Sequence, residues 1–425
     1  MRYNKPITSI NGEVVFLQTD CIIVGGGAAG LTAAAALGER GLRVAVIERL
    51  DRVGKKLLST GNGRCNLSNT DMRPALYGPA EAFVADVFAV TPPKDVLGFL
   101  DRLGLMTATE DGRIYPRSMQ AAAVLDVLRM ACDRPNVSLM TGQRAVGIAP
   151  SRRGGWSVQL ESGEGLFAPA LLCAMGGSAA PSMGTDGSGV QLMTGLGHSA
   201  TPCVPALVQL RSDHPALRAL KGIRVQATLT LLVDCASAAQ ETGELLFCDY
   251  GLSGVCVFQL SRIAARALAQ NRRVLVSVNL LPEVASLHAW LRARIDARPT
   301  LPAASLLTGV FHRLLAQALL REAHVAPDRP VASLSSHETD ALCRAIGALT
   351  FPITSTQGFA QAQVTSGGIR LCEIDPRTMG SRFFDGLYLA GEVLDVDGPC
   401  GGYNLHFAFA SALTAARAIG ALLGA

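Results

Sequence analysis

The stretch Cys21-Ile22-Ile23-Val24-Gly25-Gly26-Gly27-Ala28-Ala29-Gly30 joins an apolar tetrapeptide to Gly-x-Gly-x-x-Gly. It predicts a buried parallel strand over 20–24 and a helix over 28–40. In such a unit the first glycine allows a tight turn, the second lets the backbone approach a pyrophosphate, and the third lets the helix lie close to the sheet. Because the N–H groups at the helix start attract phosphates, we expect a dinucleotide to be bound by Gly25, Gly27, Ala28, Ala29 and Gly30.

An acidic residue follows the next expected strand, 43–47. Glu48 lies 48 − 25 = 23 residues after Gly25, a spacing at which a carboxylate holds ribose hydroxyls. A carboxylate there disfavours a 2′-phosphate on the adenosine. In a chain with 44 glycines the glycine motif alone is a weak signal, and a glycine-rich turn without a ligand is the alternative. The flanking strand, the helix and Glu48 together favour the dinucleotide site.

A second strand that ends in a glycine and an acid lies near the C-terminus, at Gly386-Leu387-Tyr388-Leu389-Ala390-Gly391-Glu392. A nicotinamide dehydrogenase has no need of it. A protein that binds FAD does need such a segment, because the ribitol and flavin ring of FAD require contacts far from the adenosine. We therefore predict FAD, with Glu392 holding a ribitol hydroxyl beside Gly391. Leu171–Gly177 resembles the strand-to-turn segment that passes near FAD, which adds Gly176 to the site.

The segment Asp395–Asn404 ends in Gly401-Gly402-Tyr403-Asn404, before a helix expected over 405–423. We expect the N–H groups of the glycine pair to face the flavin N1–C2=O region. A helix N-terminus there stabilises the charge that develops at N1 on two-electron reduction. An ordinary glycine-rich helix start is the alternative. Tyr403 and Asn404 belong to the same predicted site.

The loop Gly61-Asn62-Gly63-Arg64-Cys65-Asn66 leaves the edge of the sheet at which ligands bind in such folds. We expect Arg64 to neutralise pyrophosphate and Asn62, beside Gly63, to hydrogen-bond the ring edge. Lys56, just upstream, is expected to meet a phosphate. The alternative is a solvated glycine and asparagine loop.

The remaining chain first alternates strand and helix patterns, then becomes rich in short strands, and then becomes helical. Residues 144–149 and 156–160 predict a hairpin joined by Arg152–Gly155. Further strands are expected at 137–140 and 170–174, with helices at 80–89, 93–103 and 118–133. Later β-rich runs are expected at 203–211, 223–234, 244–248 and 273–280. They are followed by expected helices at 284–297, 303–319 and 337–348. The simplest arrangement is a discontinuous α/β FAD-binding domain of the two-dinucleotide (glutathione-reductase-like Rossmann) type, 20–196 with 351–425. It is interrupted by an inserted β-rich domain, 197–282, and a helical subdomain, 283–350.

Bulk properties set outer limits on the function. The 425 residues allow two or three domains, and 49% hydrophobic residues with a mean hydropathy of +0.30 indicate a well-filled globular interior. No apolar run approaches the ~18 residues of a membrane span. Residues 1–19 carry charges and no apolar core, so they predict an N-terminal arm and not a signal peptide. We expect a cytoplasmic protein without membrane contact. Its net charge of +4 permits RNA binding without demanding it.

The eleven cysteines fit a reducing compartment. They form no Cys-x-x-Cys and no spaced cluster, so no metal or iron–sulfur site is predicted. Their positions are 21, 65, 132, 173, 203, 235, 248, 256, 343, 372 and 400.

Several of these segments together resemble the BaiN/RdsA family of FAD-dependent oxidoreductases over about 20–420. The residues that carry the resemblance are Gly25–Gly30, Gly61–Asn66, Tyr250–Gly254, Thr365–Gly368 and Gly391–Asn404. The resemblance implies an FAD domain with inserted β-rich and helical parts. It also implies one of two reductions: uridine to dihydrouridine in large-subunit ribosomal RNA, which is the leading expectation, or an enone bond in a steroid-like acid. Gly61–Asn66 and Gly401–Asn404 are the specific signatures of the family. Residues 1–19 depart from the family, as do His406 and Phe407, which follow the second signature.

Both reactions need a hydride and a proton. The candidate proton donors are Cys400, Cys65, Tyr403 and His406, although a lone cysteine is more often a packing residue. No second Gly-x-Gly-x-x-Gly follows a strand, so NAD(P)H is expected only as a transient electron donor, or electrons arrive from a separate reductase partner. A flavin-carrying redox or RNA-binding protein without turnover, and an oxidase that uses O₂, remain as alternatives.

Overall fold

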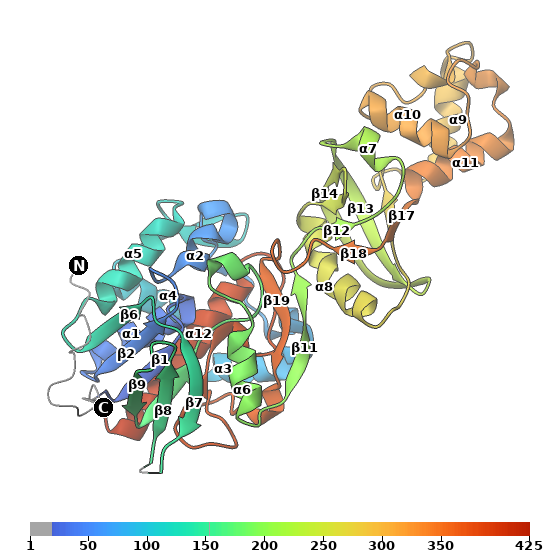
Figure 1. Ribbon diagram of the computed structural model, residues 1–425. Coiled ribbons are helices and arrows are strands. Elements are labelled where there is room, and N and C mark those ends of the chain that lie inside the picture. Colours follow the sequence, from blue (N-terminus) through green and yellow to red (C-terminus); the bar gives the residue numbers. More distant parts are fainter. Residues whose placement is uncertain (1–18, 153) are drawn as a thin grey trace. The chain divides into compact units, whose positions relative to one another are not determined.

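The computed structural model describes residues 19–152 and 154–425 (Figure 1). Apart from Thr19, the N-terminal arm expected at 1–19 lies outside the described residues, as does Arg153 of the hairpin turn. The chain divides into two compact units. The first contains the described residues up to Cys203 together with Gln363–Ala425, and the second is Val204–Ala362. The second unit begins and ends further along the chain than the boundaries proposed at 197 and 350.

A five-stranded parallel sheet forms the centre of the first unit, in the order β20-β10-β1-β2-β6. The C-terminal strand β20 and the N-terminal strand β1 therefore lie in one sheet, on either side of β10. Every residue of β1 and β10 is buried, as in parallel strands that are covered on both faces. The strands are β1 (Cys21–Val24), β2 (Val44–Glu48), β6 (Val137–Thr141), β10 (Ala170–Cys173) and β20 (Leu387–Leu389). This arrangement confirms the predicted α/β fold class with a dinucleotide-binding sheet.

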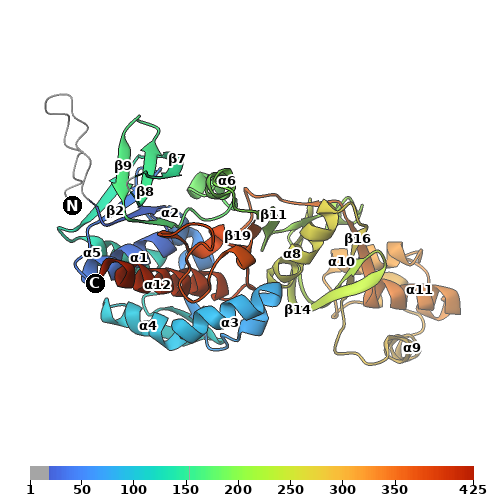
Figure 2. The same ribbon diagram turned by 90° about the horizontal axis from the view of Figure 1, so that it is seen from below.

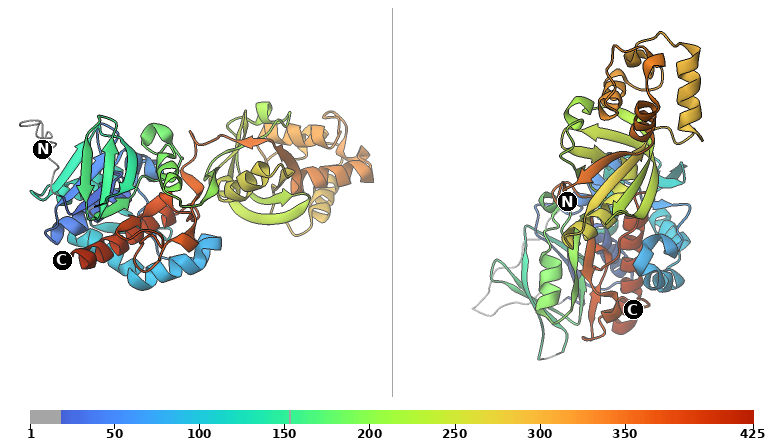
Figure 3. Two further views of the ribbon diagram at one scale, coloured as in Figure 1. Left: turned by 60° about the horizontal axis from the view of Figure 1, so that its bottom comes forward. Right: turned by 90° about the vertical axis from the view of Figure 1, so that its right-hand side faces the viewer.

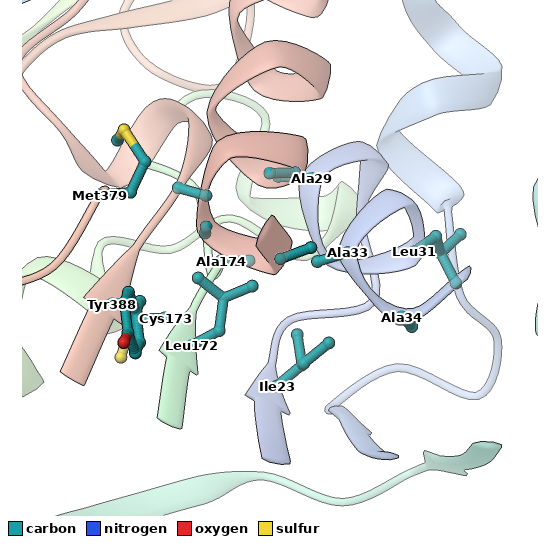
Figure 4. Close-up of a cluster of buried hydrophobic side chains, with 14 of the residues drawn as sticks. Ile23, Ala29, Leu31, Ala33, Ala34, Leu172, Cys173, Ala174, Met379 and Tyr388 are labelled. Carbon is teal, nitrogen blue, oxygen red and sulfur yellow. The ribbon is translucent and has the colours of Figure 1, made fainter. Parts of the chain in front are cut away.

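Two small-residue helices pack together over this sheet. α1 (Ala28–Glu39) lies against α12 (Tyr403–Leu423), so the first and last helices of the unit are in contact (Figure 2). Figure 4 shows alanines of α1 beside Ile23 and Leu172 of the strands. A Cβ at Gly30 would stand 1.8 Å from the Gly25 carbonyl oxygen. Gly30, the third glycine of the motif, thus allows the first turn of α1 to pack against the backbone of Gly25 as well as against the sheet.

Smaller elements surround the parallel sheet. The predicted hairpin is part of a three-stranded antiparallel sheet, β7-β8-β9 (Figure 3). A second three-stranded sheet has the order β3-β5-β4, and β11 pairs with β19. The helices are α2 (Lys55–Ser59), α3 (Glu81–Val90), α4 (Pro93–Arg102), α5 (Ala121–Cys132) and α6 (Ser188–Gly195). The strands are β3 (Ser68–Asn69), β4 (Thr107–Glu110), β5 (Arg113–Pro116), β7 (Ala145–Pro150), β8 (Trp156–Leu160), β9 (Gly165–Ala168), β11 (Ala200–Ala206) and β19 (Val364–Ile369).

The second unit contains a seven-stranded antiparallel sheet, in the order β17-β16-β13-β14-β15-β12-β18. Its strands and helices share one hydrophobic core. The strands are β12 (Leu210–Arg211), β13 (Arg224–Val233), β14 (Ala236–Cys248), β15 (Gly251–Ser253), β16 (Val274–Asn279), β17 (Leu349–Ile353) and β18 (Ser355–Thr356). The helices are α7 (Leu217–Leu220), α8 (Val255–Ala269), α9 (Leu287–Ala297), α10 (Arg313–Glu322) and α11 (Ser336–Gly347).

Two sequence predictions for this unit were wrong. The β-rich stretch contains the fifteen-residue helix α8, whose buried Val257, Leu260 and Ala264 have the spacing of a helix face. The helix expected over 303–319 begins only at Arg313. A short 3₁₀ turn precedes it, and Gly309 has a φ of +80°, which ends the helical pattern there.

The expectation that no segment is apolar enough to span a membrane also needs correction. By length and composition α12 could do so, with a mean hydropathy of 1.4. However, 61% of its most apolar window is buried inside the fold. We therefore interpret α12 as a helix of the protein core that is long and apolar enough to resemble a membrane span.

Candidate cofactor and active site

The loops that follow β1, β10 and β20 lie at one edge of the parallel sheet, because these strands are neighbours and run in the same direction. Gly25 has a φ of +108°, and a Cβ there would lie 2.3 Å from the Ala174 carbonyl oxygen. A Cβ on Gly176 would lie 2.7 Å from Thr185 Cγ2 and 4.0 Å from Glu392 Oε2. Gly25 and Gly176 thus allow the three loops to approach one another at this edge, which is where ligands bind in such sheets.

The start of α1 is open. Gly27 is its N-cap residue with a φ of −85°. Among the described residues no side chain caps the helix, and a Cβ at Gly27 would meet no atom within 4 Å. The first N–H groups of a helix have no partner within the helix, and here those of Ala28 and Ala29 adjoin that open space. The residues present therefore fit a dinucleotide pyrophosphate, which would take hydrogen bonds from this helix start.

Glu48 is positioned by the loops beside it. Its Oε2 accepts from Gly26 N at 3.0 Å and its Oε1 accepts from Leu50 N at 2.9 Å. Burial raises the pKa of Glu48, while these two backbone N–H groups lower it. The two bonds fix the carboxylate at the end of β2 and leave one lone pair on each oxygen for ribose hydroxyls.

A partly buried ion pair connects the two halves of the site. Lys56 Nζ lies 2.6 Å from Glu392 Oε2, and the two side chains are 20% and 21% exposed. Thr365 N donates to the other oxygen of Glu392 at 2.6 Å. Lys56 thus contacts the acid predicted to hold ribitol, whereas the sequence had placed it beside a phosphate. Gly391 packs beside the first turn of α1, because a Cβ there would lie 3.2 Å from Ala29 Cβ.

The two signature segments bind each other. Asn69 Nδ2 donates to Gly401 O at 3.0 Å, and the Ser68 hydroxyl lies 2.9 Å from His406 Nδ1. With its amide oxygen turned towards Gly402, Asn66 accepts from Gly402 N at 3.1 Å. A Cβ on Gly402, whose φ is +98°, would lie 2.3 Å from Ser68 O. The segment 61–69 and the segment 398–406 are therefore held as one structure.

Three predicted contacts differ from what this arrangement provides. The Gly402 N–H was expected to face the flavin and is instead bonded to Asn66. Asn404 closes its own loop, accepting from Gly398 N at 2.8 Å and donating to Gly398 O at 3.0 Å. Arg64 pairs with Glu110 and lies over the Tyr115 ring, 4.5 Å from its centroid, so its charge is already neutralised. Asn62 and Gly63 are exposed.

The four candidate proton donors have different surroundings. Cys65 is fully buried and burial raises its pKa to about 11. His406 is fully buried, and burial lowers its pKa to about 3, so its ring is neutral near pH 7. Neither environment suits a proton donor. Burial also raises the pKa of Cys400 and of Tyr403, and the nearby Arg113 charge opposes both rises. Unlike Cys65 and His406, Cys400 is partly exposed and Tyr403 is 7% exposed, so these two remain the proposed donors.

Sequence reasoning missed two structural parts of the site. Thr365 is fully buried and its hydroxyl accepts from Ser178 N at 2.8 Å and Ala179 N at 2.9 Å, which ties the loop after β10 to β19. Ser68 and Asn69 directly follow the 61–66 signature, and their polar side chains were the available signal. Within residues 19–152 and 154–425, no group of three or more His, Cys, Asp or Glu side chains is placed to hold a metal ion.

Comparison with known proteins decides the family. A family model described as the HI0933-like protein Rossmann domain matches residues 19–418. The chain belongs to this family. It is 40% identical over 402 residues to a 3-dehydro-bile acid Δ(4,6)-reductase of Clostridium scindens, covering 93% of this chain and 98% of that protein. It is 29% identical over 403 residues to a ribosomal RNA dihydrouridine synthase of Escherichia coli, covering 94% and 97%.

Among solved structures, a 3-ketosteroid Δ4-(5α)-dehydrogenase of Rhodococcus jostii aligns over 96% of this chain and 98% of that one. The TM-score is 0.49 and the identity 14%, so this likeness supports no further argument. The family match confirms the predicted family and fold class, and the relatives' names agree with the prediction of an oxidoreductase. FAD, the predicted cofactor, fits the described loops of this HI0933-like chain.

Proposed function

We propose that this HI0933-like protein uses FAD to reduce a carbon–carbon double bond conjugated to a carbonyl group. The observation that carries the proposal is the meeting of both dinucleotide segments at one edge of one parallel sheet. The names of the relatives support the reaction type, because one is a reductase of a dehydro-bile acid and another makes dihydrouridine, which is uridine with two added hydrogens.

Each of the described residues would bind a particular part of the cofactor or supply the proton. The start of α1 at Gly27 would hold the pyrophosphate, and Glu48 would hold the adenosine ribose. Glu392, fixed by Lys56 and Thr365, would hold the ribitol. When bound, FAD supplies the two-electron chemistry. Cys400 or Tyr403 would supply the proton.

A small enone, steroid-like in shape, is the first substrate class that we propose. The relative named as a bile acid reductase shares 40% of its residues with this chain over nearly the whole length of both. Uridine in large-subunit ribosomal RNA is the second class, supported by the 29% identity to the dihydrouridine synthase. Both substrates present an electron-poor alkene next to a carbonyl, so the same flavin site suits either.

We further propose that the protein works in the cytoplasm, outside any membrane. Electrons would come from NAD(P)H bound transiently at the flavin or from a separate reductase partner, because no second Gly-x-Gly-x-x-Gly follows a strand.

The test is single-turnover reoxidation. The purified yellow protein is reduced with dithionite under argon and mixed either with 4-androstene-3,17-dione or with an unmodified rRNA transcript. We expect the flavin absorbance to return with one of them and the product to gain two hydrogens by mass spectrometry. Folded, FAD-loaded protein that neither compound reoxidises would refute the reductase, and retained RNA binding in that case would favour a protein without turnover. Rapid peroxide formation in air would favour an oxidase.

A further inference from the structure

Arg113 lies near the loop that contains Gly401 and has no role in the site described so far. Arg113 begins β5, where it lies opposite Asn69 of β3 and Glu110 of β4 in the strand register. Asn69 in turn donates to Gly401 O at 3.0 Å. The small sheet β3-β5-β4 therefore holds Arg113 one strand away from the segment that carries Cys400 and Tyr403.

The Arg113 side chain is half-buried, and within the described parts of the chain it forms no ion pair and no hydrogen bond. Its neighbours differ in this respect. Arg64 pairs with Glu110, and Arg73 Nε lies 2.7 Å from Asp71 Oδ1. Because a partly desolvated charge is costly without a partner, an unpaired guanidinium at this place indicates that a ligand supplies the partner.

A second polar group nearby is also available. Tyr403 is 7% exposed, and its hydroxyl forms no hydrogen bond with any residue that the structure describes. A Cβ on Gly401 would lie 3.2 Å from Tyr403 Cε2 and 3.4 Å from Asn69 Nδ2, and Asn69 stands opposite Arg113 in the strand register. The Arg113 charge also lowers the pKa of Cys400 and of Tyr403, against the effect of burial. Arg113, Cys400 and Tyr403 therefore lie around the same loop, where a cation accompanies two weak acids.

We propose that Arg113 binds the carbonyl oxygen of the substrate and stabilises the negative charge that this oxygen gains during the reaction. The inference rests on the proposed function and narrows its substrate class to α,β-unsaturated carbonyl compounds that present their oxygen to Arg113. A guanidinium suits this task because it keeps its charge and offers several N–H donors in a fixed plane.

The chemistry balances with the groups named. Hydride from the reduced cofactor adds to the β-carbon, and the electron pair of the double bond moves to the carbonyl oxygen, which becomes an enolate. Arg113 holds that oxygen, in the manner of an oxyanion-binding donor. A proton from Tyr403 or Cys400 then adds to the α-carbon, the carbonyl forms again, and solvent returns the proton to the donor. The substrate gains two hydrogens and the cofactor is oxidised.

The test uses p-nitrophenol, a phenol whose phenolate mimics an enolate oxygen and whose absorbance reports its own ionisation. Binding to the oxidised, FAD-loaded protein is titrated above and below the pKa of the free phenol. The variants are Arg113→Gln, Arg113→Lys and the matched control Arg117→Gln, an exposed arginine just after β5. Thermal unfolding and FAD content of each variant show whether it is folded and loaded.

We expect Arg113→Gln to bind the phenolate about 10- to 100-fold more weakly, as for the loss of a charged hydrogen bond, and to bind the neutral phenol as before. Arg113→Lys should recover part of the phenolate affinity, and Arg117→Gln should match the wild type. Unchanged phenolate affinity in folded, FAD-loaded Arg113→Gln would overturn the inference, as would an equal loss in Arg117→Gln.

The outcome is separable from the proposed function. If neither enone nor rRNA reoxidises the wild type, but phenolate binding still depends on Arg113, then the oxyanion site stands and the reductase proposal fails. If the enone is reduced equally fast by the wild type and by Arg113→Gln, then the reductase stands and the role of Arg113 fails.

Discussion

Replacing Gly25 or Gly27, the first two glycines of the Gly-x-Gly-x-x-Gly motif, with alanine should have different effects on the protein. A Cβ at Gly25 would stand 2.3 Å from the Ala174 carbonyl oxygen, and the residue has a φ of +108°. At Gly27 a Cβ meets no atom of the described part of the chain within 4 Å, and the φ is −85°. The first glycine is therefore required by the fold itself, whereas the second is required only by what binds in front of it.

The magnitudes follow from these contacts. Gly25→Ala adds backbone strain of about 1–2 kcal/mol and an overlap of about 1–3 kcal/mol, so we expect about 2–5 kcal/mol of lost stability. Gly27→Ala should leave the free energy of unfolding unchanged or raise it by about 0.4–1 kcal/mol. Its methyl group occupies the approach to the α1 N–H groups, and losing one charged hydrogen bond should weaken FAD binding about 10- to 150-fold.

The assay measures the two properties separately. Urea unfolding is followed on flavin-free protein, because bound FAD would itself stabilise the fold, and FAD affinity is measured by quenching of flavin fluorescence. Wild-type FAD affinity in Gly27→Ala would refute the placement of the pyrophosphate at α1. Wild-type stability in Gly25→Ala would refute the close approach of the two loops.

Three further perturbations address other parts of the site. Glu48→Ala should lower the FAD content of the purified protein, as read from the ratio of flavin to protein absorbance; full content would exclude Glu48 as the ribose acid. Cys400→Ala should retain FAD and slow reoxidation by substrate; an unchanged rate would leave Tyr403 as the proposed donor. The pKa of His406 is lowered from 6.5 to about 3 in the folded protein, so the unfolded chain binds the extra proton and stability is lost as pH falls below about 6.5. Between pH 7 and pH 5, His406→Gln should therefore lose about 2 kcal/mol less than the wild type in urea unfolding; equal slopes for His406→Gln and wild type would contradict the buried neutral ring.

Local patterns in the sequence were sufficient for the dinucleotide fold. The strand of Cys21–Val24, the glycines after it and the strand of Leu387–Leu389 are short-range signals, because burial on both faces and tight turns restrict which residues can stand there. Glu48 and Glu392 could be named for the same reason, since Glu48 ends β2 and Glu392 comes shortly after β20. Helix α8 was not predicted although Val257, Leu260 and Ala264 have the spacing of a helix face, because it lies between strands β15 and β16 in a stretch that is otherwise rich in strands.

The partners of individual side chains could be decided only by the tertiary structure. Asn66, Ser68 and Asn69 lie more than 300 residues before the glycines and histidine they contact, and no local rule relates the two segments. Among the residues that the structure describes, the same folding gives Arg64 a carboxylate partner and leaves Arg113 without one, although both are arginines near the same loop. A residue type fixes what a side chain is able to bind, whereas its environment, set by chain segments distant in sequence, decides whether that capacity is already used within the protein or remains for a ligand.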